Sequence, residues 1–99
     1  MREADHPDDD DELVRLMVAY QTGELAAFEG LYGRLAAELR RYFQAAGADG
    51  AAQDLVQETF LAIHRSRRTY QPGLPVRPWA FGIARNVLHA CHPRPPARQ

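Results

Sequence analysis

The residues whose types and spacing most clearly suggest chemistry are two carboxylates, Asp54 and Glu58, four positions apart. On a helix this spacing puts both side chains on one face, where they could serve as a general acid and a general base. A convex helix face offers no cleft for a substrate, so we interpret the pair as part of a recognition surface. Nucleophilic chemistry finds little support, because Ser66 is the only serine and the chain has no lysine. We therefore expect a protein that is not an enzyme and uses no cofactor.

A second group of potential ligands lies near the end of the chain, where His89, Cys91 and His92 occur close together. Residues three positions apart can share a helix face, and imidazole and thiolate both bind zinc. However, His92 precedes Pro93, where a helix should end, and no second ligand cluster completes a tetrahedral shell. We predict no metal site and keep a metal- or redox-sensing domain as the weakest alternative.

Charge is distributed unevenly along the chain, although the formal net charge is only -1. Residues 1–12 are rich in aspartate and glutamate, whereas no carboxylate side chain follows Glu58 and the charged side chains beyond it are arginines. Such an imbalance favours a second half that faces a polyanion such as nucleic acid. The single cysteine excludes an internal disulfide, and no apolar run approaches the ~20 residues that span a bilayer. We expect a soluble, cytoplasmic protein.

Apolar residues recur with a helical period in the first two thirds of the chain. They predict helices over about 9–21 and 24–46, with Gly23 and Gly47 as the stops, because glycine suits the backbone conformation that ends a helix. A third helix should begin at a turn and N-cap formed by Asp49 and Gly50 and continue to about residue 65.

The prolines and glycine in 67–78 predict a loop of about twelve residues, long enough to favour a functional role. Pro78 suits the first turn of a fourth helix that runs to about Cys91, with an apolar stripe that includes Trp79 and Ile83. The predicted fold is therefore all-α, a compact bundle of about four helices. We expect an acidic segment at 1–12, a helical domain at 13–91, and a proline- and arginine-rich tail or linker at 92–99.

Two stretches of the sequence carry a family resemblance, DLVQETFL at 54–61 and RPWAFGIARNV at 77–87. In this order and at this spacing, with a proline- and glycine-containing loop between them, they closely resemble region 2 of sigma-70 family sigma factors of the extracytoplasmic-function (ECF) group. The helices expected between Leu13 and Phe43 extend the likeness over most of the chain. The resemblance implies a transcription initiation factor domain that binds RNA polymerase and promoter DNA.

The resemblance implies that the third helix docks on the clamp helices of the polymerase β′ subunit. The matching contact residues in this chain are Asp54, Gln57 and Glu58. Their spacing puts all three on one side of a helix, away from the apolar stripe that contains Val56 and Phe60. Carboxylates and an amide there can pair with basic groups on a partner helix and orient it.

The resemblance also implies that the loop and the fourth helix face the minus-ten promoter element, and that the loop holds a flipped base of the single-stranded non-template strand. Arginine can neutralise phosphate, asparagine can read a base edge and an aromatic ring can stack on an unpaired base. The residues carried over for DNA binding are Arg67, Arg68, Tyr70, Arg77, Trp79, Arg85 and Asn86. For Trp79 a place in the core is an equally good interpretation, because it shares the apolar stripe of the helix.

Two departures from the family pattern leave an alternative open. Housekeeping sigma factors carry a tryptophan pair where this chain has Gly82 and Ile83, so melting should depend on capture of a flipped base and weak promoters should open poorly. The chain also lacks the domain that reads the minus-thirty-five element, which we expect to reflect either an excised domain or a natural protein without that half. The alternative is a module that binds polymerase or an anti-sigma factor without productive DNA binding.

Overall fold

The computed structural model describes residues 7–91, which form four α-helices joined by short connections. The elements are α1 (Pro7–Gln21), α2 (Leu25–Ala45), the 3-10 turn η2 (Asp49–Ala51), α3 (Ala52–Ser66), the 3-10 turn η3 (Arg67–Thr69) and α4 (Val76–Cys91). No strand occurs within the described range. The expectation of an all-α bundle of about four helices is therefore confirmed.

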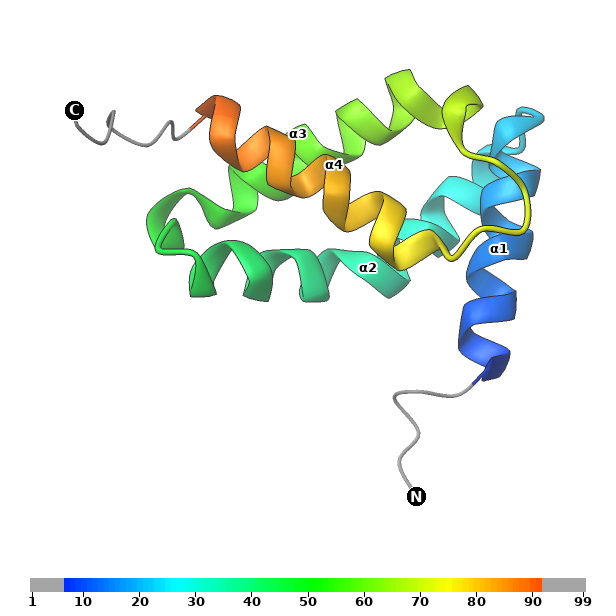
Figure 1. Ribbon diagram of the computed structural model, residues 1–99, viewed down its shortest axis with the longest axis horizontal. Helices are drawn as coiled ribbons and strands as arrows, with labels where there is room; N and C mark the ends of the chain where they lie inside the picture. Colours follow the sequence, from blue (N-terminus) through cyan, green and yellow to red (C-terminus); the bar gives the residue numbers. More distant parts are fainter. Residues whose placement is uncertain (1–6, 92–99) are drawn as a thin grey trace.

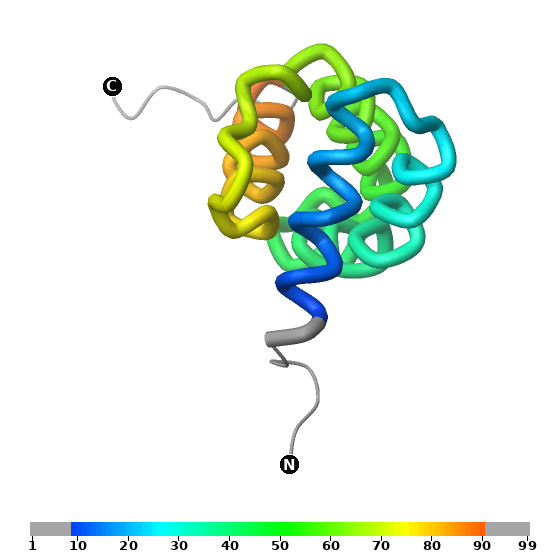
Figure 2. The backbone as a smooth tube through the Cα atoms, turned by 90° about the vertical axis from the view of Figure 1, so that its right-hand side faces the viewer, coloured from blue at the N-terminus to red at the C-terminus, as the bar shows by residue number. Residues whose placement is uncertain are grey.

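The helices are arranged as a three-helix body crossed at one end by the first helix. In Figure 1, α2, α3 and α4 extend along the long direction of the molecule, and α1 stands steeply across their right-hand end. Figure 2, turned by 90°, shows α1 in front of the other three helices, which are seen nearly end-on. The principal contacts are those of α2 with α1 and α3, and of α3 with α4. On the sides of α3 and α4 that face away from these contacts, side chains such as Glu58 and Arg85 are exposed.

A single hydrophobic core holds the four helices together. The predicted stripes of the first three helices supply most of it, and Gly30 leaves room for the Leu16 side chain of α1, since a Cβ atom there would lie 2.9 Å from its Cδ2 atom. Thr59 is a fully buried polar residue, and its hydroxyl donates to the Leu55 carbonyl at 2.7 Å. The core residues are Leu13, Met17, Tyr20, Ala27, Leu31, Leu35, Leu39, Phe43, Ala48, Ala52, Leu55, Val56, Phe60, Ile63, Tyr70, Val76, Ala80 and Ala84.

The helix ends agree with the glycine signals and disagree with the predicted cap. Gly23 and Gly47 have φ of +103° and +91°, so both end their helices as expected. The N-cap prediction for Asp49 is wrong: no side chain caps the start of α3. The backbone takes that role instead, because η2 leads directly into α3 and the Ala51 amide donates to the Ala48 carbonyl at 3.0 Å.

The fourth helix begins at Val76, so Pro78 lies in its first turn as predicted, but its buried stripe differs from the prediction. The buried residues are Val76, Ala80 and Ala84, whereas Trp79 and Ile83 are half-buried. Small side chains let α4 lie close against α3, and the larger ones are displaced toward the edges of that contact. The prediction followed the helical period and included Ala84, which is buried, but it gave Trp79 and Ile83 the buried positions that Val76 and Ala80 occupy.

Two sequence-based interpretations concern residues beyond the described range. The tail at 92–99 lies there, as does His92, which belonged to the weak metal hypothesis. Within residues 7–91, no three histidine, cysteine, aspartate or glutamate side chains are grouped so as to hold a metal ion. Among the same residues, no helix is both long enough and apolar enough to cross a membrane.

Candidate functional site

The outer face of α3 carries the three residues predicted to dock on a partner helix. Asp54, Gln57 and Glu58 are all exposed, whereas Val56 and Phe60 of the same helix are buried. The Gln57 side-chain amide donates to the hydroxyl of Tyr32 on α2 at 3.2 Å, which restrains its orientation. The geometry therefore presents two carboxylates and one restrained amide along an open helix surface.

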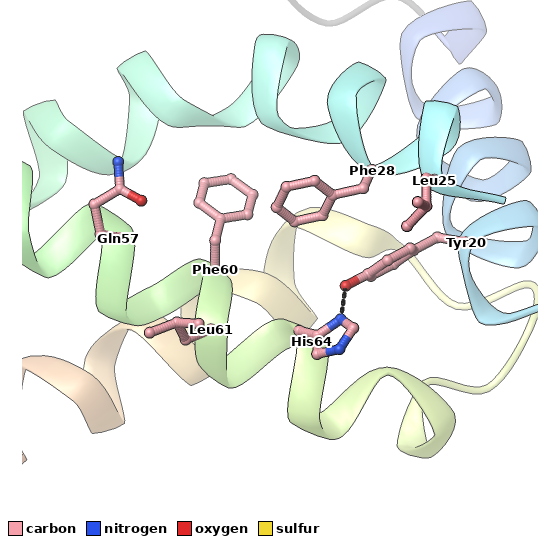
Figure 3. A pocket seen from close by; sticks show the side chains of 7 residues that line it. All are labelled: Tyr20, Leu25, Phe28, Gln57, Phe60, Leu61 and His64. Atoms are coloured by element: carbon pink, nitrogen blue, oxygen red, sulfur yellow. Dashed lines mark hydrogen bonds between the residues drawn. The ribbon is translucent and has the colours of Figure 1, made fainter. Parts of the chain in front are cut away.

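An apolar hollow of about 280 Å³ adjoins this face, between α1, α2 and α3. Figure 3 shows the rings of Phe28 and Phe60 side by side in its wall, with Gln57 toward one end and His64 toward the other. Leu25 and Leu61 at its border are 76% and 51% exposed, which is unusual for leucine. The lining residues are Tyr20, Leu25, Phe28, Gln57, Phe60, Leu61 and His64. The surface of α3 thus combines charged groups with an accessible apolar depression.

Two polar side chains form a hydrogen bond at the end of the hollow nearest the loop. The Tyr20 hydroxyl and Nδ1 of His64 are hydrogen-bonded at 2.5 Å, as the dashed line in Figure 3 marks. Burial raises the pKa of Tyr20, although the nearby Arg67 guanidinium opposes this shift. The sequence interpretation missed this hollow. Leu25 and Leu61, apolar residues outside the predicted stripes of their helices, were the signal that could have found it.

The connection between α3 and α4 is held in place by hydrogen bonds from α1 and by a buried tyrosine. The Gln21 side-chain amide donates to the carbonyls of Arg67 and Tyr70 at 2.7 and 2.6 Å. Tyr70 is 1% exposed, and its hydroxyl donates to the Leu74 carbonyl at 2.5 Å. Burial raises the pKa of Tyr70, although a hydrogen bond with the Gly73 backbone opposes this shift. The segment is therefore an ordered loop built around one aromatic side chain.

The burial of Tyr70 does not support the expectation that its ring stacks on an unpaired base, which stays a prediction. The ring packs edge-on against Trp79, with the ring centroids 5.4 Å apart. Edge-to-face aromatic pairs stabilise cores, and a ring used in this way has no free face for a base. Trp79 is half-buried, so it combines core packing with a partly accessible surface.

The arginines expected at the DNA-facing side have different environments. Arg67 is partly buried, and it donates to the His64 carbonyl at 2.7 Å while its guanidinium lies 5.9 Å from the centre of the Tyr20 ring. Arg68 and Arg85 are exposed, as is Asn86. No ion pair within residues 7–91 includes Arg68 or Arg85. These exposed groups are the ones available for phosphate and base contacts.

Arg77 differs from the others, because carboxylates of α1 and α2 surround it. Its Nε and Nη2 atoms donate to the two carboxylate oxygens of Glu38, both at 2.9 Å. Its guanidinium also lies 2.7 Å from Asp9 and 3.3 Å from Asp10. The hydrogen bond to Glu38 contributes most to raising the pKa of Arg77, and the hydrogen bond from Arg77 holds the pKa of Asp9 below its usual value. The expectation that Arg77 contacts DNA conflicts with this neutralised environment.

Gly82 and Ile83 occupy the positions at which the resemblance to sigma factors led us to look for a tryptophan pair. Gly82 is exposed, and a Cβ atom there would have no neighbour within 4 Å. Ile83 is half-buried. Neither of these two positions therefore offers an aromatic side chain to insert between bases.

The fold and these surfaces define a small helical interaction domain with two chemically different faces, one acidic and apolar on α3 and one bearing arginine and asparagine on α4. Residues 27–90 match the family model described as sigma-70 region 2. Because the match covers more than half of the chain, the protein belongs to the sigma-70 region 2 family.

Relatives narrow the family assignment to the ECF group. The chain is 38% identical over 83 residues to the ECF RNA polymerase sigma factor SigF of Caulobacter vibrioides, covering 82% of this chain and 46% of that protein. It is 39% identical over 72 residues to the RNA polymerase sigma factor CarQ of Myxococcus xanthus, covering 72% of this chain and 41% of that protein. The resemblance to ECF sigma factors is thereby confirmed. The chain spans less than half the length of these relatives.

Proposed function

We propose that this chain acts in transcription initiation by binding core RNA polymerase through α3 and single-stranded promoter DNA through α4. The observation that carries the proposal is the separation of chemistry between the two helices. α3 offers Asp54, Gln57 and Glu58 outward, and α4 offers Arg85 and Asn86. The family assignment supports this pairing of partners.

The polymerase contact is proposed to be the clamp helices of the β′ subunit. A basic partner helix would be oriented by the carboxylates of Asp54 and Glu58. The hollow bordered by Leu25 and Leu61 lies beside Gln57 and would accept an apolar side chain from the same partner. The polar groups would then orient the partner helix, and the hollow would supply the apolar area that is buried on binding. Protein interfaces commonly combine a polar rim with an apolar centre in this way.

The DNA contact is proposed to be the non-template strand of the minus-ten element. Arg85 and Arg68 would neutralise phosphates, and Asn86 would contact a base edge. The partly accessible Trp79, near the loop, would offer a base some aromatic surface. Because α4 presents no aromatic wedge at Gly82, strand capture would depend on bases that have already separated.

The test uses the 99-residue chain with two probes, a β′ fragment bearing the clamp helices and a labelled pool of random-sequence single-stranded DNA. Asp54→Ala with Glu58→Ala should weaken fragment binding by about tenfold and leave DNA binding unchanged. Arg85→Ala with Asn86→Ala should do the reverse, and should lower the slope of log affinity against log salt by roughly 0.7. Arg40→Ala, which removes an exposed arginine of α2, is the control for general charge loss. Unchanged binding of both probes by both double variants would contradict the proposal.

The second candidate function is a module that binds polymerase or an anti-sigma factor without productive DNA binding. Two of the residues expected to contact DNA favour it: Tyr70 is buried in the core, and Arg77 is paired with carboxylates. Under this alternative, the chain would retain the β′ fragment and fail to bind single-stranded DNA at any salt concentration. The same two probes therefore separate the candidates.

A further inference from the structure

The cluster around Arg77 connects three helices that are far apart in the sequence. Arg77 is the second residue of α4, Glu38 lies on α2, and Asp9 and Asp10 lie in the first turns of α1. Arg34 of α2 also pairs with Asp9, with its Nη1 atom 3.0 Å from the carboxylate. One guanidinium thus receives carboxylates from two other helices, at the point where the loop ends and α4 begins.

The geometry of this contact is that of a structural clamp. The paired hydrogen bonds from Nε and Nη2 to Glu38 fix the plane of the guanidinium as well as its distance. The side chains of Arg77 and Glu38 are 28% and 31% exposed, so solvent screens the pair less than it screens a surface ion pair. A phosphate at this position would have to displace carboxylates that already occupy the donors.

The position of Arg77 determines what the clamp can control. The next residues of α4 pack on the core through Val76 and Ala80. The exposed Arg85 and Asn86 lie two to three turns further along the same helix, because an α-helix has about 3.6 residues per turn. A change in the direction of α4 at its first turn is carried along the helix and displaces these groups.

We propose that Arg77 is a positioning residue that clamps the start of α4 to α1 and α2 and thereby places Arg85 and Asn86 for single-stranded DNA. This inference rests on the proposed DNA-binding function of α4. It gives the acidic start of the chain a defined role, since Asp9 and Asp10 complete the clamp. It also removes Arg77 from the set of phosphate contacts.

The first arm of the test measures the clamp itself by urea unfolding of the 99-residue chain. Arg77→Gln and Glu38→Gln should each lower the folding equilibrium constant by roughly tenfold, because each removes the paired, charge-assisted hydrogen bonds between the two side chains. The double variant should lose little more than either single variant, since both remove the same interaction. Arg40→Gln serves as the matched control and should change stability little. If the losses of the two single variants added up in the double variant, the claim that Arg77 and Glu38 stabilise the fold through one shared interaction would be wrong.

The second arm separates positioning from direct phosphate contact, using random-sequence single-stranded DNA. Arg77→Gln should weaken affinity severalfold while the salt slope stays unchanged, whereas Arg85→Gln should lower the slope by roughly 0.7. Arg77→Lys should not restore affinity, because lysine keeps the charge but cannot make the paired contact to Glu38. Glu38→Gln should weaken DNA binding. Loss of a negative charge alone would strengthen it, so the two explanations predict opposite results.

The outcomes distinguish the clamp from the function on which it rests. A lower salt slope for Arg77→Gln, or full rescue by Arg77→Lys, would make Arg77 a phosphate contact and overturn the positioning role. Failure of the unsubstituted chain to bind DNA would contradict the proposed function of α4, and with it the positioning role. In that case, coupling between Arg77 and Glu38 in unfolding would identify the cluster as a purely structural brace.

Discussion

The outer face of α3 and the region from the loop into α4 differ in what determines the exposure of the side chains that we propose for binding. On α3, Asp54, Gln57 and Glu58 are exposed simply because helical phase turns them away from the buried Val56 and Phe60. In the loop and α4, exposure depends on residues elsewhere in the chain: Gln21 fastens the loop, and Glu38 engages Arg77. A binding face on one regular helix is therefore a local property, and one formed by a loop and a helix end is not.

The largest expected effect tests whether Tyr70 belongs to the core. Tyr70→Ala should lower the free energy of unfolding by about 3–5 kcal/mol, the range for removing a buried aromatic side chain. Tyr70→Phe should cost only about 1 kcal/mol, because it loses the hydrogen bond to the Leu74 carbonyl and keeps the packing on Trp79. Urea unfolding followed by circular dichroism measures both.

The same pair of variants sharpens the comparison between the two regions. If Tyr70 acts only through the fold, Tyr70→Phe should bind single-stranded DNA as the unsubstituted chain does. If Tyr70→Ala instead stayed folded and lost DNA affinity, Tyr70 would be a direct DNA contact. The difference between the loop and α3 would then disappear, because neither would depend on distant residues for its binding side chains.

Sequence reasoning recovered the fold well because helical period and glycine stops are local signals. It located all four helices within a few residues, and Gly23 and Gly47 end their helices as expected. The triad on α3 was chosen by resemblance, and helical spacing correctly predicted that its three side chains are exposed on one side of the helix. What it missed depends on contacts across the sequence: the bond from Arg77 to Glu38 spans 39 positions, and the contact from Gln21 to Tyr70 spans 49. No local pattern marks such pairs, so Arg77 and Tyr70 were assigned by resemblance alone.

The next largest effect concerns the hollow beside the α3 triad. Leu61→Asp places a charge at the border of an apolar depression that we propose is buried on binding, so it should weaken binding of the β′ clamp fragment by roughly 30-fold, about 2 kcal/mol. Leu61 is 51% exposed, so the fold should tolerate the change. Titration of the labelled β′ fragment by fluorescence anisotropy measures the affinity.

The matched control for Leu61 is Leu74→Asp, since Leu74 is 45% exposed and lies in the loop before α4. It should leave fragment binding unchanged. Equal weakening by both variants would mean that the hollow has no special part in polymerase binding, and that the α3 face works through its polar groups alone.

A smaller effect compares two helical glycines, one on the outer side of α4 and one between α1 and α2. Gly82→Ala should stabilise the chain by up to about 1 kcal/mol, because Gly82 is exposed and a Cβ atom there meets nothing within 4 Å. Gly30→Ala has the same gain in helix propensity, but its Cβ would lie 2.9 Å from Leu16, so we expect no stabilisation or a net loss. Thermal unfolding of both variants decides the comparison. A destabilised Gly82→Ala would show that this part of α4 is not an open surface.

The smallest expected effect is the acid sensitivity of the contact between α1 and α4. The pKa of Asp9 is lowered from 3.8 chiefly by its hydrogen bond with Arg77. A lowered pKa in the folded state means that the unfolded state binds the proton more readily, so this stabilisation is complete above the unfolded value and disappears as pH falls through the folded one. Between pH 5 and pH 2, the unsubstituted chain should therefore lose more stability than Asp9→Asn, and the difference between the two should shrink toward zero at the acid end. Unfolding by urea at each pH gives both curves. Parallel curves would mean that the Asp9 carboxylate contributes nothing to holding the start of α1 against α4, and that Arg77 is positioned by Glu38 and Asp10 without it.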